Sequence, residues 1–309
     1  MKIGIGIGEI ATRPADMAGL AAEAKRAEDA GFASVWLANI FGVDAMTAAT
    51  VCGLATKTIA VGTGVVPTYP RHPFAMAQQA ASVSSATGNR FTLGIGLSHQ
   101  IVIENMLGLS FAKSYSHMKE YLGVLGPLIR EGKVQFDGEM YKVNAALKVP
   151  GATPCPILIA ALAPKMLALA GSVADGTITW MTGPKTLAEH IVPSVRQAAS
   201  EAGRPAPRIV AGLPISVSDD AAASRETAGK VFRQYGALPS YRAMLDREGA
   251  AGPADVAIVG TEAEVTATLD RMEEAGVTEL LGAPFQTRKD DDSLARTWDL
   301  LVARAKRDR

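Results

Sequence analysis

The chain has 309 residues, and its 31 lysines and arginines are balanced by 31 aspartates and glutamates. A general nucleic-acid-binding protein needs a basic face to neutralise phosphates, so this charge balance argues against one. Hydrophobic residues make up 48% of the sequence, which favours a folded chain over a disordered one. Cys52 and Cys155 lie far apart and form no CxxC pair. We therefore expect two buried thiols, and neither a disulfide framework nor a zinc site.

The chain offers no sign of membrane insertion or secretion. No segment approaches the roughly 18 consecutive apolar residues of a membrane span. The first residues, Met1 to Glu9, alternate glycine and isoleucine, and no small-residue cleavage site follows them. We read this stretch as a first buried strand and expect a cytoplasmic protein with no membrane partner.

Short apolar runs rich in β-branched residues recur along the chain, and an amphipathic or alanine-rich stretch follows each of them. The runs that we expect to be strands are 2–8, 34–38, 59–66, 91–96, 156–160, 176–181, 208–217 and 278–283. A first helix is predicted over 14–30, with Gly31 as its stop, and further helices over 73–86, 164–174, 187–202 and 262–275. Eight strands separated by helices in a chain of this length predict a (β/α)8 TIM barrel that forms one domain, 1–309.

Two intervals are too long for single helical connections. They are 97–155 after the fourth strand and 218–276 after the seventh. The first contains Asp137-Gly138 between short apolar runs, which predicts a hairpin turn, and the second should hold several helices. Such insertions on a barrel usually shape the substrate pocket. The rival fold, an open dinucleotide-binding sheet, is disfavoured because Gly4-x-Gly6-x-Gly8 is not GxGxxG.

In a TIM barrel the active site lies at the C-terminal ends of the strands. Glu9 is the one carboxylate close to a predicted strand end, so a metal site is not expected. Glycine and alanine dominate these ends instead, which suggests a planar cofactor held largely by main-chain hydrogen bonds. Among the histidines, His99 is the candidate for function, whereas His117 and His190 are interpreted as satisfied residues on helix faces. Core packing would explain Trp36 and Trp180 without any ligand.

Several segments carry a family resemblance when they are taken together, in order and at their spacings. They are AGFASVW at 30–36, VGTGVVP at 61–67 with RHP at 71–73, GNRFTLGIG at 88–96, PKML at 164–167, AG at 170–171 and ADG at 174–176. The chain resembles the luciferase-like flavin- and deazaflavin-dependent oxidoreductases, and among them the branch that uses coenzyme F420, a deazaflavin.

The resemblance implies a deazaflavin lying across the mouth of the barrel. It also implies a non-prolyl cis peptide at Gly64–Val65 behind the ring, with Trp36 and Trp180 close to it. The start of the helix at Pro164 would favour an anionic tail. The residues implied to bind the cofactor are Asn39, Thr63, Gly64, Val65, Gly96, Leu97, Ser98, Ala160, Ala161, Leu162, Ala163, Gly176, Thr179, Trp180, Met181 and Thr182.

The sequence departs from the family at the positions that handle protons. Related dehydrogenases often carry an Asp or an Asp-His pair after the second strand, where this chain has Asn39-Ile40. The loop after the fourth strand usually supplies a Glu, and here it reads Ser98-His99-Gln100. Because an amide cannot act as a general base, proton transfer falls by elimination to His99, with Gln100 beside it as the second candidate catalytic residue.

The same departure places sugar-phosphate and methanopterin substrates in doubt. An apolar mouth formed by Phe41, Leu97, Trp180 and Met181 better fits a hydrophobic carbonyl, imine or activated alkene. We expect an F420-dependent oxidoreductase that moves a hydride between the deazaflavin C5 and a small organic substrate. The family also implies a homodimer packed through its outer helices.

Three alternatives stay open. An FMN-dependent monooxygenase on the same fold would consume oxygen, which a deazaflavin does not. A non-catalytic cofactor carrier would bind without turnover. A phosphosugar-handling barrel would bind neither cofactor.

Overall fold

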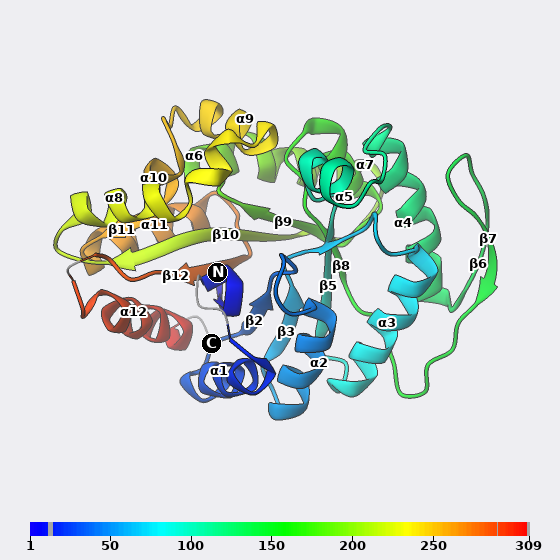
Figure 1. Ribbon diagram of the computed structural model, residues 1–309, viewed down its shortest axis with the longest axis horizontal. Helices are drawn as coiled ribbons and strands as arrows, with labels where there is room; N and C mark the ends of the chain where they lie inside the picture. Colours follow the sequence, from blue (N-terminus) through cyan, green and yellow to red (C-terminus); the bar gives the residue numbers. More distant parts are fainter. Residues whose placement is uncertain (12–14, 289, 308–309) are drawn as a thin grey trace.

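The computed structural model describes residues 1–11, 15–288 and 290–307. Parallel strands close into a barrel in the order β1-β2-β3-β5-β8-β9-β10-β12, and β12 pairs back with β1. Helices surround the strands (Figure 1). The predicted TIM barrel is therefore confirmed. The strands are β1 (Lys2–Ile7), β2 (Ser34–Leu37), β3 (Ala60–Thr63), β5 (Phe91–Gly96), β8 (Ile157–Ile159), β9 (Gly176–Trp180), β10 (Arg208–Val217) and β12 (Glu279–Pro284).

The predicted third strand, 59–66, is divided in two. β3 ends at Thr63, the peptide bond Gly64–Val65 is cis, and the short strand β4 (Val66–Pro67) then pairs with β5. The cis bond that the resemblance implies is thus confirmed.

The helices follow the predicted pattern with small shifts at their ends. They are α1 (Met17–Ala30), α2 (Ala45–Ala55), α3 (Pro73–Ala86), α5 (Pro164–Ser172), α6 (Pro184–Thr186), the π-helical turn η3 (Leu187–Ile191), α7 (Val192–Glu201) and α12 (Ser293–Arg307). α1 starts later than predicted because Asp16 caps it by accepting the Gly19 N–H, and Pro14 lies outside the described residues. α2 and α12 were not predicted. α2 is apolar on almost every face, so it has no amphipathic period.

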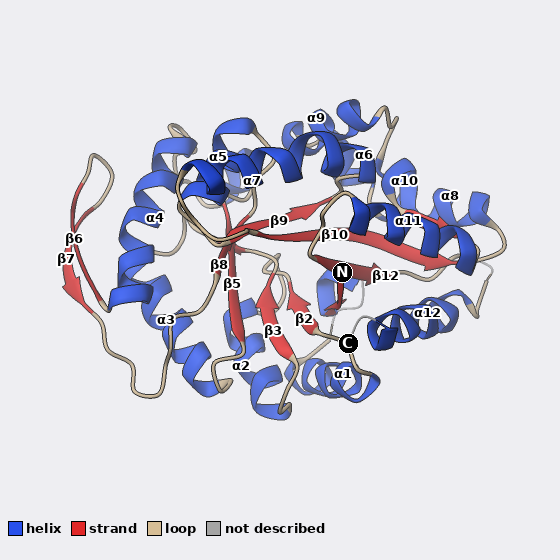
Figure 2. Ribbon diagram, turned by 180° about the vertical axis from the view of Figure 1, so that it is seen from behind, coloured by secondary structure: helices blue, strands red, loops and turns tan. Residues whose placement is uncertain are grey.

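The first insertion connects β5 to β8. It contains the π-helical turn η2 (Ile101–Met106), the helix α4 (Ser114–Glu131) and the strands β6 (Lys133–Asp137) and β7 (Lys142–Ala146). β6 and β7 form the antiparallel hairpin predicted at Asp137-Gly138, and it stands apart from the barrel beyond α4 (Figure 2). The Glu120 carboxylate on α4 accepts the backbone N–H groups of residues 139–141, which holds the hairpin turn in place.

The second insertion connects β10 to β12. Its elements are α8 (Ala221–Val231), the 3-10 helix η4 (Arg233–Ala237), α9 (Pro239–Glu248), α10 (Pro253–Val256), β11 (Ile258–Gly260) and α11 (Glu262–Glu274). The predicted helices are present, but so is β11, which pairs with the C-terminal part of β10 and was not predicted. A strand of three residues carries too short an apolar pattern to be recognised in sequence.

The barrel interior is filled by a small cluster distinct from the layer between strands and helices. It consists of Ile10, Trp36, Leu158, Ile178, Val210 and Leu281. Trp36 is fully buried, and a Cβ on Gly62 would lie 2.5 Å from its ring. Its indole therefore occupies space that a glycine leaves free, and core packing accounts for it.

A buried carboxylate lies in the barrel interior at the N-terminal ends of the strands. Glu279, only 3% exposed, accepts hydrogen bonds from the Ser34 hydroxyl and the Trp36 Nε1–H. Its other oxygen lies 2.9 Å from Arg208 Nη2. One carboxylate thus links three strands, β2, β10 and β12.

Both cysteines are buried and unpaired, as expected. Burial raises the pKa of each thiol to about 12, and only the thiolate reacts quickly with disulfide reagents. We expect Ellman's reagent to label neither Cys52 nor Cys155 in the native protein and both in guanidinium chloride. Equal labelling rates in the two conditions would contradict this burial.

No described helix combines the length and the apolar content that crossing a lipid bilayer requires.

Candidate active site

Three neighbouring strands end in small residues at the mouth of the barrel. A Cβ on Gly96 would lie 2.7 Å from Val65 Cγ2 and 3.2 Å from Ala160 Cβ. Behind Gly64, the side chains of Ile178 and Leu281 in the interior cluster lie 3.1 and 3.3 Å from where its Cβ would be. We call Gly64, Val65, Gly96 and Ala160 the small-residue bed. Gly64, Val65 and Ala160 are partly exposed, whereas Gly96 is buried against Val65 and Ala160, so the first three form the surface against which a flat group would lie.

An aromatic series borders this bed. His99, just after β5, lies 5.6 Å from Tyr241 of α9, measured between ring centroids. Tyr241 lies 5.4 Å from Tyr235 of η4, and Tyr235 lies 6.0 Å from Trp180 at the end of β9. The second insertion therefore supplies one wall of the mouth, as expected for an insertion on a barrel.

His99 is half-buried, and burial lowers the pKa of its imidazole. The ring is therefore neutral at pH 7, and it can donate a proton from one nitrogen and accept one at the other. Gln100 is exposed, and its Nε2 donates to Glu104 Oε2 at 2.8 Å. Of the two candidate catalytic residues, His99 is thus the one that joins the aromatic wall.

Buried polar atoms without partners mark the same end of the barrel. Among the described residues, Glu9 Oε2, Tyr69 OH and Trp180 Nε1 are covered but make no hydrogen bond. Glu9 lies just after β1, Tyr69 lies just after β4, and Trp180 is the last residue of β9. Buried polar groups are normally paired, so a ligand at the mouth would supply these partners. The small-residue bed and these atoms together fit a flat cofactor with polar edges.

Sequence reasoning used Glu9 only to argue against a metal. In the structure its carboxylate packs on the loop after β2, 2.8 Å from where a Cβ on Gly42 would lie. A pocket of about 140 Å³, lined also by Leu37, Ala38 and Val43, opens beside it. The position of Glu9 close to a strand end could have indicated a functional residue, but the sequence did not show that its carboxylate is buried.

The loop Ala161–Ala163 leads into α5 on the other side of the bed. The Ala163 carbonyl accepts the Met166 and Leu167 N–H groups, and the Leu162 carbonyl is 2.8 Å from His190 Nε2. His190 thus has the structural role expected of it. The first N–H groups of α5 carry the positive end of its dipole, which suits an anionic tail.

Three residues assigned to cofactor binding have other placements. Gly176 starts β9 and pairs with Arg208, so it lies at the opposite end of the barrel from the mouth. The prediction for Gly176 is therefore wrong. A Cβ at this position would lie 1.9 Å from the Arg208 carbonyl oxygen. The Thr63 hydroxyl is fully buried and bonds to Gly94 of β5. The Asn39 carbonyl oxygen accepts the Ala45 N–H at the start of α2, 3.1 Å away.

The remaining predicted residues lie at the strand ends. Leu97 and Ser98 follow β5, and Ser98 has a left-handed backbone with φ of 61°. Met181 and Thr182 follow β9 and are fully buried, so Met181 does not contribute to an exposed apolar rim. Thr179 Oγ1 is buried without a partner, and strand alternation places it on the opposite face of β9 from Trp180.

His117, on α4, belongs to a buried cluster that borders the mouth through Tyr69. It stacks on Tyr69 at 4.0 Å between centroids, and its Nε2 lies 2.9 Å from Thr68 Oγ1. Its Nδ1 lies 3.3 Å from the Tyr141 hydroxyl of the hairpin. Its interpretation as a satisfied residue is confirmed.

Burial lowers the pKa of His117 to about 4, whereas an unfolded histidine titrates near 6.5. Between these values only the unfolded state takes up the proton, so stability falls as the pH drops from about 6.5 to 4. We expect this loss to be on the order of 2 kcal/mol and to shrink in His117→Gln. Thermal melts at pH 7, 5.5 and 4.5 test it. An identical pH dependence in the variant would refute the assignment.

The fold and the site define a (β/α)8 barrel with small residues and buried polar atoms without partners at its mouth. The chain belongs to the luciferase-like monooxygenase family, whose model matches residues 3–279. It is 28% identical over 297 residues to a 5,10-methylenetetrahydromethanopterin reductase from Methanolobus tindarius, which covers 86% of this chain and 90% of that protein. It is 31% identical over 192 residues to an F420-dependent glucose-6-phosphate dehydrogenase from Nakamurella multipartita, which covers 60% of this chain and 56% of that protein.

The fold is also that of a solved coenzyme F420-dependent tetrahydromethanopterin reductase from Methanopyrus kandleri. The TM-score is 0.78 at 21% identity, over 98% of this chain and 96% of that one. These relatives are named for different substrates.

Proposed function

We propose that the protein is an F420-dependent oxidoreductase that moves a hydride between the deazaflavin C5 and a small organic substrate. The observation that carries this proposal is the small-residue bed next to buried polar atoms that lack partners. Similarity to a relative named as F420-dependent supports the choice of deazaflavin. When bound, the deazaflavin supplies the hydride chemistry, and the protein supplies position and exclusion of water.

The residues divide into those that hold the cofactor and those that handle protons. Gly64, Val65, Gly96 and Ala160 would support the ring, and Trp180 Nε1 and Tyr69 OH would donate to its polar edge. The loop 161–163 and the start of α5 would hold the phosphate-bearing tail. His99, neutral at pH 7, would give or take the substrate proton, and Glu9 is the carboxylate at the mouth that is tested beside it.

The substrate class follows from the rim. Phe41 is 67% exposed after β2, and Leu97 is half-buried after β5. These side chains favour a hydrophobic carbonyl, imine or activated alkene over a sugar phosphate. Turnover with such a panel, using reduced F420, should fall in His99→Asn and in Glu9→Gln if either group handles the proton. Cofactor binding should be retained in His99→Asn.

The first experiment is a titration of the protein with F420 and separately with FMN, followed by intrinsic tryptophan fluorescence. Trp180 lies at the mouth, whereas Trp36 is fully buried below it, so Trp180 should carry most of the quenching. Trp180→Phe should remove most of the signal. Trp298→Phe is the control, because Trp298 packs on Phe32 and Arg26 outside the barrel interior. Absence of binding by both cofactors would overturn the proposal.

The second candidate is an FMN-dependent monooxygenase, because the matching family is described as luciferase-like monooxygenases, but the relatives named above as F420-dependent do not favour it. Preference for FMN together with oxygen uptake by the reduced complex would support it. Binding of F420 without turnover across the panel would instead support a carrier.

We also propose a homodimer packed through outer helices in a cytoplasmic protein. Leu54, 68% exposed on α2, is an apolar side chain available for such a contact. Light scattering measures the mass directly, and a monomer at micromolar concentration would contradict the dimer.

A further inference from the structure

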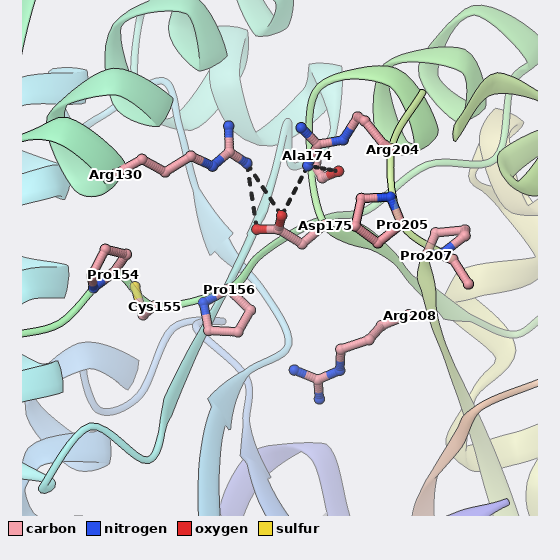
Figure 3. Close-up of a pocket in the computed structure, with 11 residues that line it drawn as sticks. Arg130, Pro154, Cys155, Pro156, Ala174, Asp175, Arg204, Pro205, Pro207 and Arg208 are labelled. Carbon is pink, nitrogen blue, oxygen red and sulfur yellow. Dashed lines mark hydrogen bonds and ion pairs between the residues drawn. The ribbon is translucent and has the colours of Figure 1, made fainter. Parts of the chain in front are cut away.

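A second pocket lies at the end of the barrel opposite to the candidate active site. It has a volume of about 370 Å³ and is lined by the residues that precede β8, β9 and β10, together with Arg130 of α4. Its walls include four prolines, Pro154, Pro156, Pro205 and Pro207 (Figure 3). Each proline ring fixes its own φ, which restricts the backbone of these walls.

The lining carries more positive than negative charge. Arg130, Arg204 and Arg208 contribute three guanidinium groups, and Asp175 is the only carboxylate among the lining residues. Glu279 neutralises Arg208 from the barrel interior, 2.9 Å away. One positive charge is therefore left over within a concave surface.

Two of the arginines are only partly used by the protein. Arg130 contacts Asp175 and the Val173 carbonyl through Nη2 alone, at 3.1–3.4 Å. Arg204 contacts Asp175 Oδ1 and the Ala174 carbonyl through its own Nη2, at 2.9 and 3.0 Å. Figure 3 shows the two guanidinium groups on either side of the carboxylate. Within the described chain, their other N–H groups have no protein acceptor.

Asp175 does not by itself require both arginines. Its Oδ2 already accepts the Ile157 N–H at 2.8 Å, and Arg204 alone would neutralise it. The guanidinium group of Arg130 therefore adds N–H donors beyond those that Asp175 needs, and these donors indicate an acceptor that is not part of the chain. Guanidinium groups bind phosphate and carboxylate through paired N–H donors.

We propose that this pocket binds a small oxyanion, either inorganic phosphate or the phosphate or carboxylate group of a small molecule. The site is separate from the cofactor site and does not depend on the proposed function. Arg208 connects it to the barrel interior, because its partner Glu279 also accepts the Trp36 Nε1–H. Binding should therefore alter the fluorescence of a tryptophan that no solvent reaches.

Isothermal titration with inorganic phosphate, glycerol phosphate and citrate tests the proposal, with sodium chloride at equal ionic strength as the control for screening. We expect saturable binding of at least one probe with a dissociation constant below about 1 mM. Stronger binding of glycerol phosphate than of phosphate would identify an esterified ligand, and the reverse would identify the free ion.

Two variants test the location. Arg130→Gln should weaken binding about 5-fold or more, and Arg296→Gln, which alters a surface arginine paired with Asp219 and Glu262, should not. Ala206→Glu places a carboxylate on the exposed rim without touching the Asp175 pairs, and should weaken binding about 10-fold. Ala222→Glu, on an exposed face of α8, is its matched control.

Three results would overturn the proposal. The first is anion binding that does not saturate and is equally strong in Ala206→Glu and Ala222→Glu. Such binding would mean an adventitious ion only. Another is displacement of the anion by F420, which would place it at the mouth. The third is saturable binding that leaves Trp36 fluorescence, read in a Trp180→Phe/Trp298→Phe background, unchanged.

Discussion

Replacing Ala160 with leucine is expected to weaken F420 binding by about 100-fold, equivalent to ~2.7 kcal/mol. Ala160 is half-buried directly after β8, and its Cβ lies 3.2 Å from where a Cβ on Gly96 would be. A leucine at this position would cover the partly exposed surface of the small-residue bed. A flat ring would then lose its contact with Gly64 and Val65. Fluorescence titration of the variant measures the change in the dissociation constant.

Ala60→Leu is the matched control. Ala60 is also a half-buried alanine next to a barrel strand terminus. It is the first residue of β3, so it lies at the end of the barrel opposite to Ala160. Both variants add the same side chain, and circular dichroism and melting temperature show whether each folds. We expect Ala60→Leu to bind F420 like the unmodified protein. If Ala160→Leu and Ala60→Leu bind F420 with equal affinity, the small-residue bed is not part of the cofactor site.

Replacing Glu279 with alanine is expected to destabilise the protein by about 3 kcal/mol. The change removes a carboxylate that is 3% exposed and leaves the Ser34 hydroxyl and Arg208 Nη2 without their acceptor, while the Trp36 Nε1–H keeps only its 2.9 Å bond to Ser34 Oγ. Breaking a buried pair is costly because the remaining charge stays partly desolvated. Arg208 is about one-third exposed, which keeps the loss at the lower end of the range. Thermal and denaturant unfolding measure it.

Two further variants separate charge from hydrogen bonding. Glu279→Gln retains a carbonyl oxygen for Ser34 and Trp36, so its loss should be smaller than that of Glu279→Ala. Glu262→Ala removes an exposed partner of Arg296 and should cost at most about 1 kcal/mol. A loss in Glu279→Ala no larger than in Glu262→Ala would show that the buried network contributes little.

The overall architecture was predictable because it depends on local patterns. Apolar runs of strand length alternate with amphipathic stretches, and the helix predicted at 73–86 agrees with α3 at both ends. The Asp137-Gly138 turn likewise encodes its hairpin locally. Prediction failed where the pattern was short, as in β11, or apolar on almost every side, as in α2, and it also missed the amphipathic helix α12.

The candidate site was only partly predictable. Which residues end a strand can be read from the chain, and this placed Gly96, Ala160 and His99 at the mouth. Sequence alone could not show that Tyr235 and Tyr241, more than 130 residues further on, form a wall beside His99. It also misplaced Gly176, because a residue that begins a parallel strand lies at the opposite end of the barrel from one that ends it.

The sequence by itself determined the barrel, its two insertions and the residue types available at the strand ends, because these follow from periodicity and turn chemistry. Only the tertiary structure decided which polar atoms are buried without partners and which arginines face a common pocket. Burial, pairing and pKa depend on groups that are distant in the chain and adjacent in space. That is why the burial of Glu9 and the pocket around Asp175 emerged from the folded protein alone.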